Sequence, residues 1–422
     1  MKNKKKILAG IVAILGQLSC GSNSSNNGTP DNTASCKQVM SATSVWKSLS
    51  NQSTTPANGF ISYDEVPDQR AAEYYIDLEI GNQVFSVIAD TGSANLIIFG
   101  DATLCPNCNA TQGYTPSASA TNLQEPFKVS YGSGSGMATR FQDKTSLTCD
   151  TSPQLATFAV VTSQQDLTSI LGLAYAPLAE PTDNPITPFF DQLMQNHQGS
   201  LNNVFSMLLC GHLNGSTITL GDADSRIDRS TIQFTPIIKE LYYSINAKNI
   251  QVLDWALSNG NWMPSPGAVT IIGALPTAGS SGGVQTIVDS GTTMNLFPPQ
   301  IVDSVRALME AVSTNNNLNI PTGFWVSDPT DTSTYSLALA DSVISQLPTF
   351  QITVAGDNGD IPLNMPPQVY LKVTSDKTMR IFSFRKTTSL TILGQAFMEN
   401  FYIEFDRGNK RLGFAPNTGL CS

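Results

Sequence analysis

The chain has 422 residues, of which 41% are hydrophobic and 13% charged, and its formal net charge is −10. This length and apolar content predict a large folded protein with two or three domain cores. After the first six residues there is no basic cluster that could follow a phosphate backbone, so we expect no nucleic-acid partner. The low charge, the many small polar residues and the alternating apolar positions favour short strands over long amphipathic helices, and we expect mostly β-structure.

Residues 1–19 have the anatomy of an export signal. Four lysines precede an apolar run over residues 7–15, which is too short to span a bilayer comfortably but has the length of a secretory core. Residues 18–21 (Leu-Ser-Cys-Gly) resemble the bacterial lipobox, although Gln17 stands where that motif usually has an aliphatic residue. We therefore expect a lipid anchor on Cys20 and a bacterial protein facing the periplasm or cell surface, with ordinary signal cleavage and secretion as the alternative.

The next two segments precede the compact body. Residues 20–35 are mostly Ser, Asn, Gly and Thr, which predicts a disordered tether. Residues 36–70 form an N-terminal extension of mixed composition, in which we expect a short helix near residues 45–49. The compact body is predicted to begin near Ala71.

The cysteines favour disulfides over metal sites. The chain has seven, and assigning Cys20 to a lipid leaves an even number, as expected of an exported protein. The two histidines, His197 and His212, lie in no metal-ligand pattern, so we expect neither a metal nor a cofactor. The disulfide candidates are Cys36, Cys105, Cys108, Cys149, Cys210 and Cys421.

The compact body contains an internal repeat. Residues 88–93 (Ile-Ala-Asp-Thr-Gly-Ser) are echoed by residues 287–292 (Ile-Val-Asp-Ser-Gly-Thr), and each follows a β-like run. Farther along, Ile-Leu-Gly occurs at residues 170–172 and again at residues 392–394. Because both motifs occur in the same order in both halves, the sequence predicts two duplicated lobes. The second lobe carries extra residues, which we place in the polar stretch around 314–334.

The repeated motif has chemical potential because each copy places a carboxylate, Asp90 or Asp289, at a strand end. The glycine that follows lets the backbone turn where a Cβ would clash. The hydroxyl side chains around it can donate hydrogen bonds to the carboxylate. One such motif is a weak signal, but two framed copies favour a catalytic pair over two structural turns.

The two halves together resemble the pepsin family of aspartic proteases. Beyond the repeated aspartate motifs, three further kinds of segment are similar to family elements: a flap hairpin at 127–134, the paired supports of the catalytic loops at 170–175 and 391–397, and the closing run at 401–415. The resemblance implies an all-β fold of two barrel-like lobes related by a pseudo-two-fold axis, at residues 71–238 and 239–422. A cleft between the lobes would take an extended peptide, and we expect a peptide or protein as substrate and a monomeric enzyme.

The mechanism implied by the resemblance is general acid–base catalysis by Asp90 and Asp289. Two carboxylates held ~3 Å apart do not both ionise readily, so they share a proton, and a water between them attacks the peptide carbonyl. The residues carried over as support for the two aspartates are Thr91, Gly92, Ser93, Ser290, Gly291 and Thr292. Tyr131 and Gly132 match the flap, whose tyrosine leans over the substrate.

Two positions depart from the family pattern. Ile97 stands where most members have a tryptophan that bonds the flap tyrosine, so we expect Tyr131 to be held less firmly. Residues 21–72 contain only three basic residues against four acidic ones, unlike the basic inhibitory pro-segment of family zymogens. We therefore expect activity without removal of a pro-segment.

The resemblance also implies disulfide pairings. Residues 205–211 are similar to family members in which the equivalent of Cys210 bonds a cysteine near the C-terminus, here Cys421. Cys105 and Cys108 fall where family members have a small loop disulfide. Cys36 and Cys149 are then left as the third pair.

Other functions fit the sequence less well. Residues 279–283 match the Gly-x-Ser-x-Gly string of serine hydrolases, but no strand precedes them and no helix signal follows. No βαβ pattern surrounds Cys105 and Cys108, which argues against a redox site. A catalytically inactive pepsin-fold protein that binds or inhibits another protein remains the alternative, although both aspartate motifs are intact here.

Overall fold

The computed structural model describes residues 37–39, 73–108, 112–131, 134–147, 153–165, 169–197, 201–211, 213, 215–224, 226–276, 285–326, 336–374 and 378–421. The export signal, the tether, the helix expected near residues 45–49, and Cys20, Cys36, Gly132 and Cys149 lie outside these residues. Within the described part of the chain, no helix combines the length and the apolar character needed to cross a membrane.

The first half of the body is built from one sheet. Its strands are β2 (Tyr75–Ile80), β3 (Gln83–Asp90), β4 (Leu96–Phe99), β5 (Thr121–Tyr131), β6 (Gly134–Leu147), β7 (Gln154–Gln165) and β8 (Ile170–Gly172). They are ordered β2-β3-β8-β4-β7-β6-β5, and β2 also pairs with β6, so the sheet closes into a barrel. In β2 every second residue, Ile76, Leu78 and Ile80, is buried, which is the pattern of a strand with one face on a core.

The second half has three smaller sheets. Its strands are β12 (Ser244–Ile245), β13 (Ala247–Ser258), β14 (Asn261–Ala274), β15 (Thr286–Val288), β16 (Asn295–Phe297), β17 (Ser336–Leu337), β18 (Phe350–Gly356), β19 (Gly359–Met365), β20 (Leu371–Val373), β21 (Arg380–Phe382), β22 (Phe384–Lys386) and β23 (Thr391–Leu393). The sheet orders are β12-β15-β23-β16-β22, β14-β13-β18-β19 and β17-β21-β20. The first of these sheets carries the second aspartate motif.

The helices are mostly short. They are η2 (Ala176–Leu178), α1 (Phe189–Asn196), η3 (Arg229–Thr231), α2 (Pro299–Asn315), α3 (Thr322–Val326), α4 (Asp341–Ile344), α5 (Pro367–Tyr370) and α6 (Gln395–Met398). The composition did not lead us to expect the long amphipathic helix α2, which ends where we placed the polar insertion. It begins at a proline and buries Ile301, Val305 and Leu308 at helical spacing.

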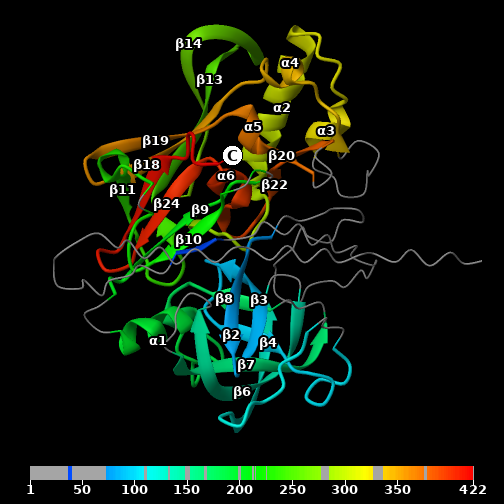
Figure 1. Cartoon of the computed structure of the whole chain (residues 1–422). Coiled ribbons are helices and arrows are strands. Elements are labelled where there is room, and N and C mark those ends of the chain that lie inside the picture. Colours follow the sequence, from blue (N-terminus) through cyan, green and yellow to red (C-terminus); the bar gives the residue numbers. More distant parts are fainter. Residues whose placement is uncertain are drawn as a thin grey trace, which may run out of the picture.

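A six-stranded sheet joins the two halves. It contains β1 (Lys37–Val39), β9 (Val204–Leu208), β10 (Thr217–Leu220), β11 (Gln233–Pro236), β24 (Phe401–Asp406) and β25 (Arg411–Pro416), ordered β1-β10-β9-β24-β25-β11. Figure 1 shows β9, β10 and β24 between the first-half barrel and the second-half strands. This architecture confirms the predicted mostly β, two-lobed fold. The division at residue 238 stays a prediction, since β24 pairs with β9.

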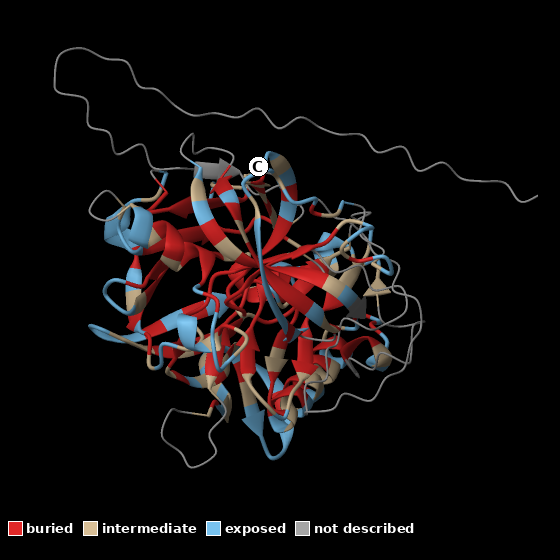
Figure 2. Ribbon diagram, turned by 90° about the horizontal axis from the view of Figure 1, so that it is seen from below, coloured by how far each residue is buried: buried red, intermediate tan, exposed pale blue. Residues whose placement is uncertain are grey.

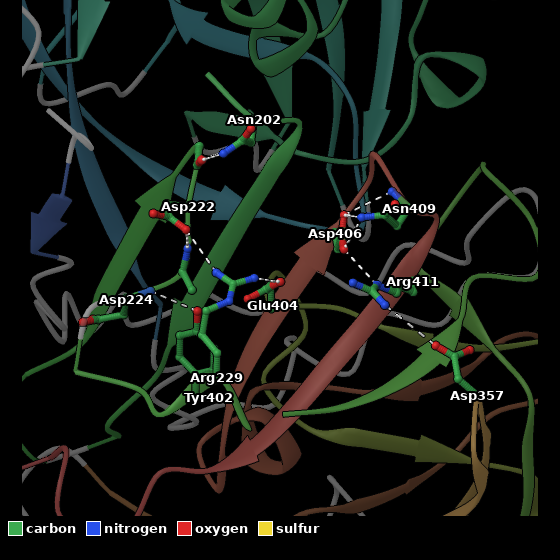
Figure 3. A network of polar contacts seen from close by, with 12 residues as sticks. Asn202, Asp222, Asp224, Arg229, Asp357, Tyr402, Glu404, Asp406, Asn409 and Arg411 are labelled. Atoms are coloured by element: carbon green, nitrogen blue, oxygen red, sulfur yellow. Dashed lines mark hydrogen bonds and ion pairs between the residues drawn. The ribbon is translucent and has the colours of Figure 1, made fainter. Parts of the chain in front are cut away.

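Charged side chains make a network of polar contacts along the six-stranded sheet (Figure 3). Arg229 lies 3.0 Å from a carboxylate oxygen of Asp222 and 3.1 Å from one of Glu404, whose side chain is fully buried. Arg411 Nε donates to Asp406 Oδ2 at 2.8 Å. These contacts hold the chain around η3 and the turn after β24 against the sheet.

The apolar core continues across the junction of the halves. Figure 2 shows buried strand residues meeting in the middle of the molecule. There Phe205 of β9 stacks on Phe405 of β24 with ring centroids 4.6 Å apart, and Tyr243 meets Phe405 edge-on at 4.7 Å. Since this core is close-packed and shared, it fixes the two aspartate motifs relative to each other.

Candidate active site

The two predicted aspartates lie at equivalent strand ends. Asp90 is the last residue of β3, and Asp289 directly follows β15. Strand β3 pairs in parallel with β8, opposite Gly172, and β15 pairs in parallel with β23. Each Ile-Leu-Gly element of the repeat therefore lies beside the aspartate strand of its own half.

Each carboxylate accepts the same two hydrogen bonds from its own loop. The Gly92 N–H donates to Asp90 Oδ1 at 2.7 Å, and the Ser93 hydroxyl donates to Oδ2 at 2.5 Å. In the second half the Gly291 N–H donates to Asp289 Oδ1 at 2.8 Å, and the Thr292 hydroxyl donates to Oδ2 at 2.6 Å. Donors of this kind favour the ionised carboxylate and fix its orientation.

The two loops are also hydrogen-bonded to each other through the residue between Asp and Gly. The Thr91 hydroxyl accepts from the Ser290 N–H at 2.9 Å and donates to the Val288 carbonyl at 3.1 Å. The Ser290 hydroxyl accepts from the Thr91 N–H at 3.0 Å and donates to the Ala89 carbonyl at 2.6 Å. Both side chains are completely buried, and their four bonds lock the strand ends together.

The glycines bring the carboxylates face to face. A Cβ built on Gly92 would lie 2.6 Å from Asp289 Oδ1, and one built on Gly291 would lie 2.3 Å from Asp90 Oδ1. No side chain fits at such distances, so each carboxylate occupies the space that the opposite glycine leaves free. The two acids therefore meet where the two loops come together, as the family resemblance implied.

Burial and mutual repulsion dominate the electrostatics of this pair. Asp90 is 8% exposed and Asp289 7%. Burial, and then the charge of Asp289, raise the pKa of Asp90 well above its ordinary value, while the bonds from Ser93 and Gly92 lower it in part. Like charges at this separation favour a state in which the pair holds one proton.

One residue near the acids was not singled out in the sequence. Tyr242 is half-buried just before β12, and its pKa is raised first by burial and then by the charges of Asp289 and Asp90. Its hydroxyl thus lies within electrostatic reach of both carboxylates. Only its position before the strand that pairs with β15 could have marked it.

The predicted flap falls in a strand hairpin. Strands β5 and β6 pair from Thr121 to Tyr131, and Tyr131 is the last residue of β5. Ile97, which occupies the position of the family tryptophan, is buried in a cluster with Phe127, Val129 and Ala138 of this hairpin. An aliphatic side chain therefore packs under the hairpin without offering a hydrogen bond.

Two disulfides occur in the described residues. Cys105 bonds Cys108, and Cys210 bonds Cys421 across a sequence separation of 211 residues. Both are pairs that the family resemblance implied. Disulfides of this kind are typical of an exported protein.

The proteins that this chain is similar to are aspartyl proteases, which agrees with the geometry of the two aspartate loops. The family described as "Eukaryotic aspartyl protease" matches residues 73–417. A "Beta-secretase" of Strongylocentrotus purpuratus is 28% identical over 398 residues, covering 82% of this chain and 67% of that protein. A "Cathepsin E" of Cavia porcellus is also 28% identical, covering 82% and 81%, and a "Gastricsin" of Callithrix jacchus is 27% identical, covering 88% and 89%. The chain therefore belongs to the eukaryotic aspartyl protease family.

Proposed function

We propose that this chain is an aspartic endopeptidase whose catalytic groups are Asp90 and Asp289. The observation that carries the proposal is the reciprocal packing of the two loops. Each carboxylate is held by two donors from its own loop and lies against the glycine of the other. Neither half could build this centre alone, because each contributes one acid.

The reaction follows from a shared proton. The ionised carboxylate takes a proton from a water molecule, and the water oxygen attacks the peptide carbonyl carbon. The protonated carboxyl donates to the carbonyl oxygen, which becomes the second hydroxyl of a tetrahedral intermediate. When the carbon–nitrogen bond breaks, the protonated carboxyl donates to the departing amine nitrogen and the ionised one takes a proton from a hydroxyl of the intermediate, so the pair again holds one proton. Which acid holds the proton at any moment is a property of the coupled pair.

The loop residues have supporting roles in this proposal. Ser93, Gly92, Thr292 and Gly291 hold the carboxylate oxygens through the four hydrogen bonds described above. Thr91 and Ser290 brace the loops against each other. Tyr131, with Gly132 beside it, is assigned to the flap over the substrate by family resemblance.

The decisive experiment compares the unaltered protein with Asp289→Asn on an unfolded protein substrate at acidic pH, with and without pepstatin. The exposed Asp303→Asn is the matched control, since its partner is the surface residue Lys386. We expect Asp289→Asn to lose at least about 10³-fold in kcat/KM and the control to lose nothing. Cleavage by Asp289→Asn at the control rate would refute the mechanism. An unaltered protein that cleaves nothing would favour an inactive binding protein.

We further propose that the protein is exported, anchored through a lipid on Cys20 in a bacterial envelope, monomeric, and active without loss of a pro-segment. The two disulfides support an oxidising compartment. The extension contributes β1 to the six-stranded sheet, which supports its retention in the working enzyme. Intact-mass analysis of the membrane fraction tests the anchor, because Cys20→Ala should abolish an acyl mass increment. Activity that appears only after cleavage near Arg70 would overturn the last part.

A further inference from the structure

Two buried tyrosines occupy equivalent places in the two halves. The Tyr74 carbonyl accepts from the Ala89 N–H at 3.0 Å, and the Tyr243 carbonyl accepts from the Val288 N–H at 3.1 Å. Ala89 and Val288 directly precede the two aspartates. Tyr74 and Tyr243 are therefore the backbone partners of the last residue before each acid.

The Tyr243 hydroxyl crosses from the second half into the first. It donates to the Leu173 carbonyl at 2.6 Å, and the Leu173 N–H donates to the Asp90 carbonyl at 2.7 Å. Tyr243 is thus bonded to the Asp289 strand through its backbone and to the neighbour of Asp90 through its side chain. One residue ties both aspartate strands together.

The Tyr74 hydroxyl makes the opposite crossing, from the first half into the second. It donates to Glu399 Oε1 at 2.7 Å and accepts from the Gly211 N–H at 2.8 Å. Glu399 closes α6, whose first residue, Gln395, donates its N–H to the Thr292 carbonyl at 2.8 Å. The first-half tyrosine is therefore connected to the segment that carries the second aspartate loop.

The surroundings show that these hydroxyls serve more than packing. Tyr74 is 1% exposed and Tyr243 is fully buried, and a buried hydroxyl costs stability unless it is bonded. Phenylalanine would fill the same space without that cost. The charged groups facing Tyr74 are Glu399 and its partner Lys372, and those near Tyr243 are Arg407 and Asp191. Burial raises the pKa of both tyrosines, so both hydroxyls stay protonated donors.

We propose that Tyr74 and Tyr243 are positioning residues that cross-brace the two aspartate strands and set the separation of the carboxylates. The proposal rests on the proposed function, because it assigns the braces to that same site. They accept from the N–H groups of Ala89 and Val288, whose carbonyls accept from the Ser290 and Thr91 hydroxyls. Without a brace the carboxylates sit farther apart on average, so their repulsion weakens and their two apparent pKa values move closer together.

The chain provides matched controls for both tyrosines. Tyr370 is buried, and its hydroxyl donates to the Pro348 carbonyl at 2.8 Å, as that of Tyr243 does to Leu173. Tyr114 is buried, and its hydroxyl donates to the Asp143 carboxylate at 2.8 Å, as that of Tyr74 does to Glu399. Neither control is bonded to the aspartate strands. Replacing either control tyrosine by phenylalanine removes a buried, hydrogen-bonded hydroxyl, as the corresponding brace variant does.

The experiment measures kcat, KM and the pH profile of kcat/KM for Tyr243→Phe, Tyr74→Phe, Tyr370→Phe and Tyr114→Phe. We expect the two brace variants to lose about tenfold in kcat with KM unchanged and to show a narrower pH bell. The controls should lower the melting temperature similarly but keep the kcat and the bell of the unaltered protein. Equal kinetic effects in Tyr243→Phe and Tyr370→Phe would overturn the proposal.

A second readout separates failure of the braces from failure of the proposed function. If Asp289→Asn cleaves as well as the unaltered protein, the catalytic assignment has failed. The braces are then judged by titrating ¹³C-labelled aspartate carboxyls by NMR, with Asp90→Asn and Asp289→Asn assigning the signals. Closer titration steps in Tyr243→Phe than in Tyr370→Phe support the brace, and identical steps refute it.

Discussion

The two aspartate loops have nearly the same internal hydrogen bonds but different surroundings. The glycine and hydroxyl donors lie at 2.7 and 2.5 Å in the first loop and at 2.8 and 2.6 Å in the second. Gly92 is half-buried and Ser93 buried, whereas the equivalent Gly291 is exposed and Thr292 half-buried. The motif thus fixes what each carboxylate bonds, while the rest of each half decides how far it is shielded from water.

A buried asparagine follows each loop, and its hydrogen-bond partners differ between the two halves. Asn95 bonds the backbone N–H and carbonyl of Glu180, each at 2.8 Å, so it ties the first loop to a distant turn. Asn295 accepts from the Gly394 N–H at 3.0 Å, so it ties the second loop to its own supporting segment. Equivalent loops are therefore held by different contacts, and variants in the two halves should differ in size of effect more than in kind.

The largest effect is expected from a methyl group on either glycine. Gly291→Ala and Gly92→Ala place a Cβ 2.3 or 2.6 Å from the opposite carboxylate, so that carboxylate must move. We expect kcat/KM to fall about 10²- to 10³-fold, with the greater loss for Gly291→Ala. Gly408→Ala is the control, since its Cβ would meet nothing closer than 3.6 Å. Steady-state kinetics with full activity in Gly291→Ala would contradict this picture of the centre.

The next effect concerns the hydrogen bonds between the two loops. Thr91→Val keeps the shape but leaves the Val288 carbonyl and the Ser290 N–H without partners in a buried place. We expect the free energy of unfolding to fall by about 2–4 kcal/mol, with a smaller loss for Thr231→Val, whose exposed hydroxyl donates to the Asp228 carbonyl. Urea denaturation measures both. Equal losses would mean that the hydrogen bonds between the loops contribute no more to the free energy of unfolding than a surface turn does.

Much of the aspartate site could be predicted from sequence because it is encoded by a short local motif that occurs twice. Residues 88–93 and 287–292 each place a carboxylate at a strand end, and duplication implies that the ends meet. The braces could not be predicted, since the acceptors of the Tyr74 and Tyr243 hydroxyls, Glu399 and Leu173, each lie in the other half of the chain. Pairing of that kind depends on tertiary packing and leaves no local signal.

Two further features, a long helix and a buried carboxylate, were not predicted from the sequence. Helix α2 has apolar residues at helical spacing, but whole-chain composition pointed to strands, so the local period was the better guide. Glu404 lies in an apolar closing strand and is fully buried beside Arg229. Its surroundings include η3, which is remote in sequence, so the burial of its charge could not be foreseen.

A smaller effect is expected in the pH dependence of stability. The pKa of Asp90 is raised in the folded protein, so folding favours its protonated form. This contribution is complete below the ordinary aspartate pKa of about 4 and is lost as the pH rises through the folded value. The melting temperature should therefore fall between about pH 4 and about pH 8, and less steeply in Asp90→Asn. Parallel plots of melting temperature against pH for the two proteins would show that neither burial nor the charge of Asp289 raises the pKa of Asp90.

The smallest effect tests a chemical difference between the loops, the Ser93 and Thr292 donors. Ser93→Ala removes a bond that lowers the pKa of Asp90, so the limb of the pH–rate profile that reports this raised pKa should move up by about one unit or less. Ser93→Thr should restore the limb, because Thr292 makes the same bond at 2.6 Å in the other loop. Rescue by threonine would show that the hydroxyl alone is required at both places. An unmoved limb in Ser93→Ala would mean that the Gly92 amide holds the carboxylate without help.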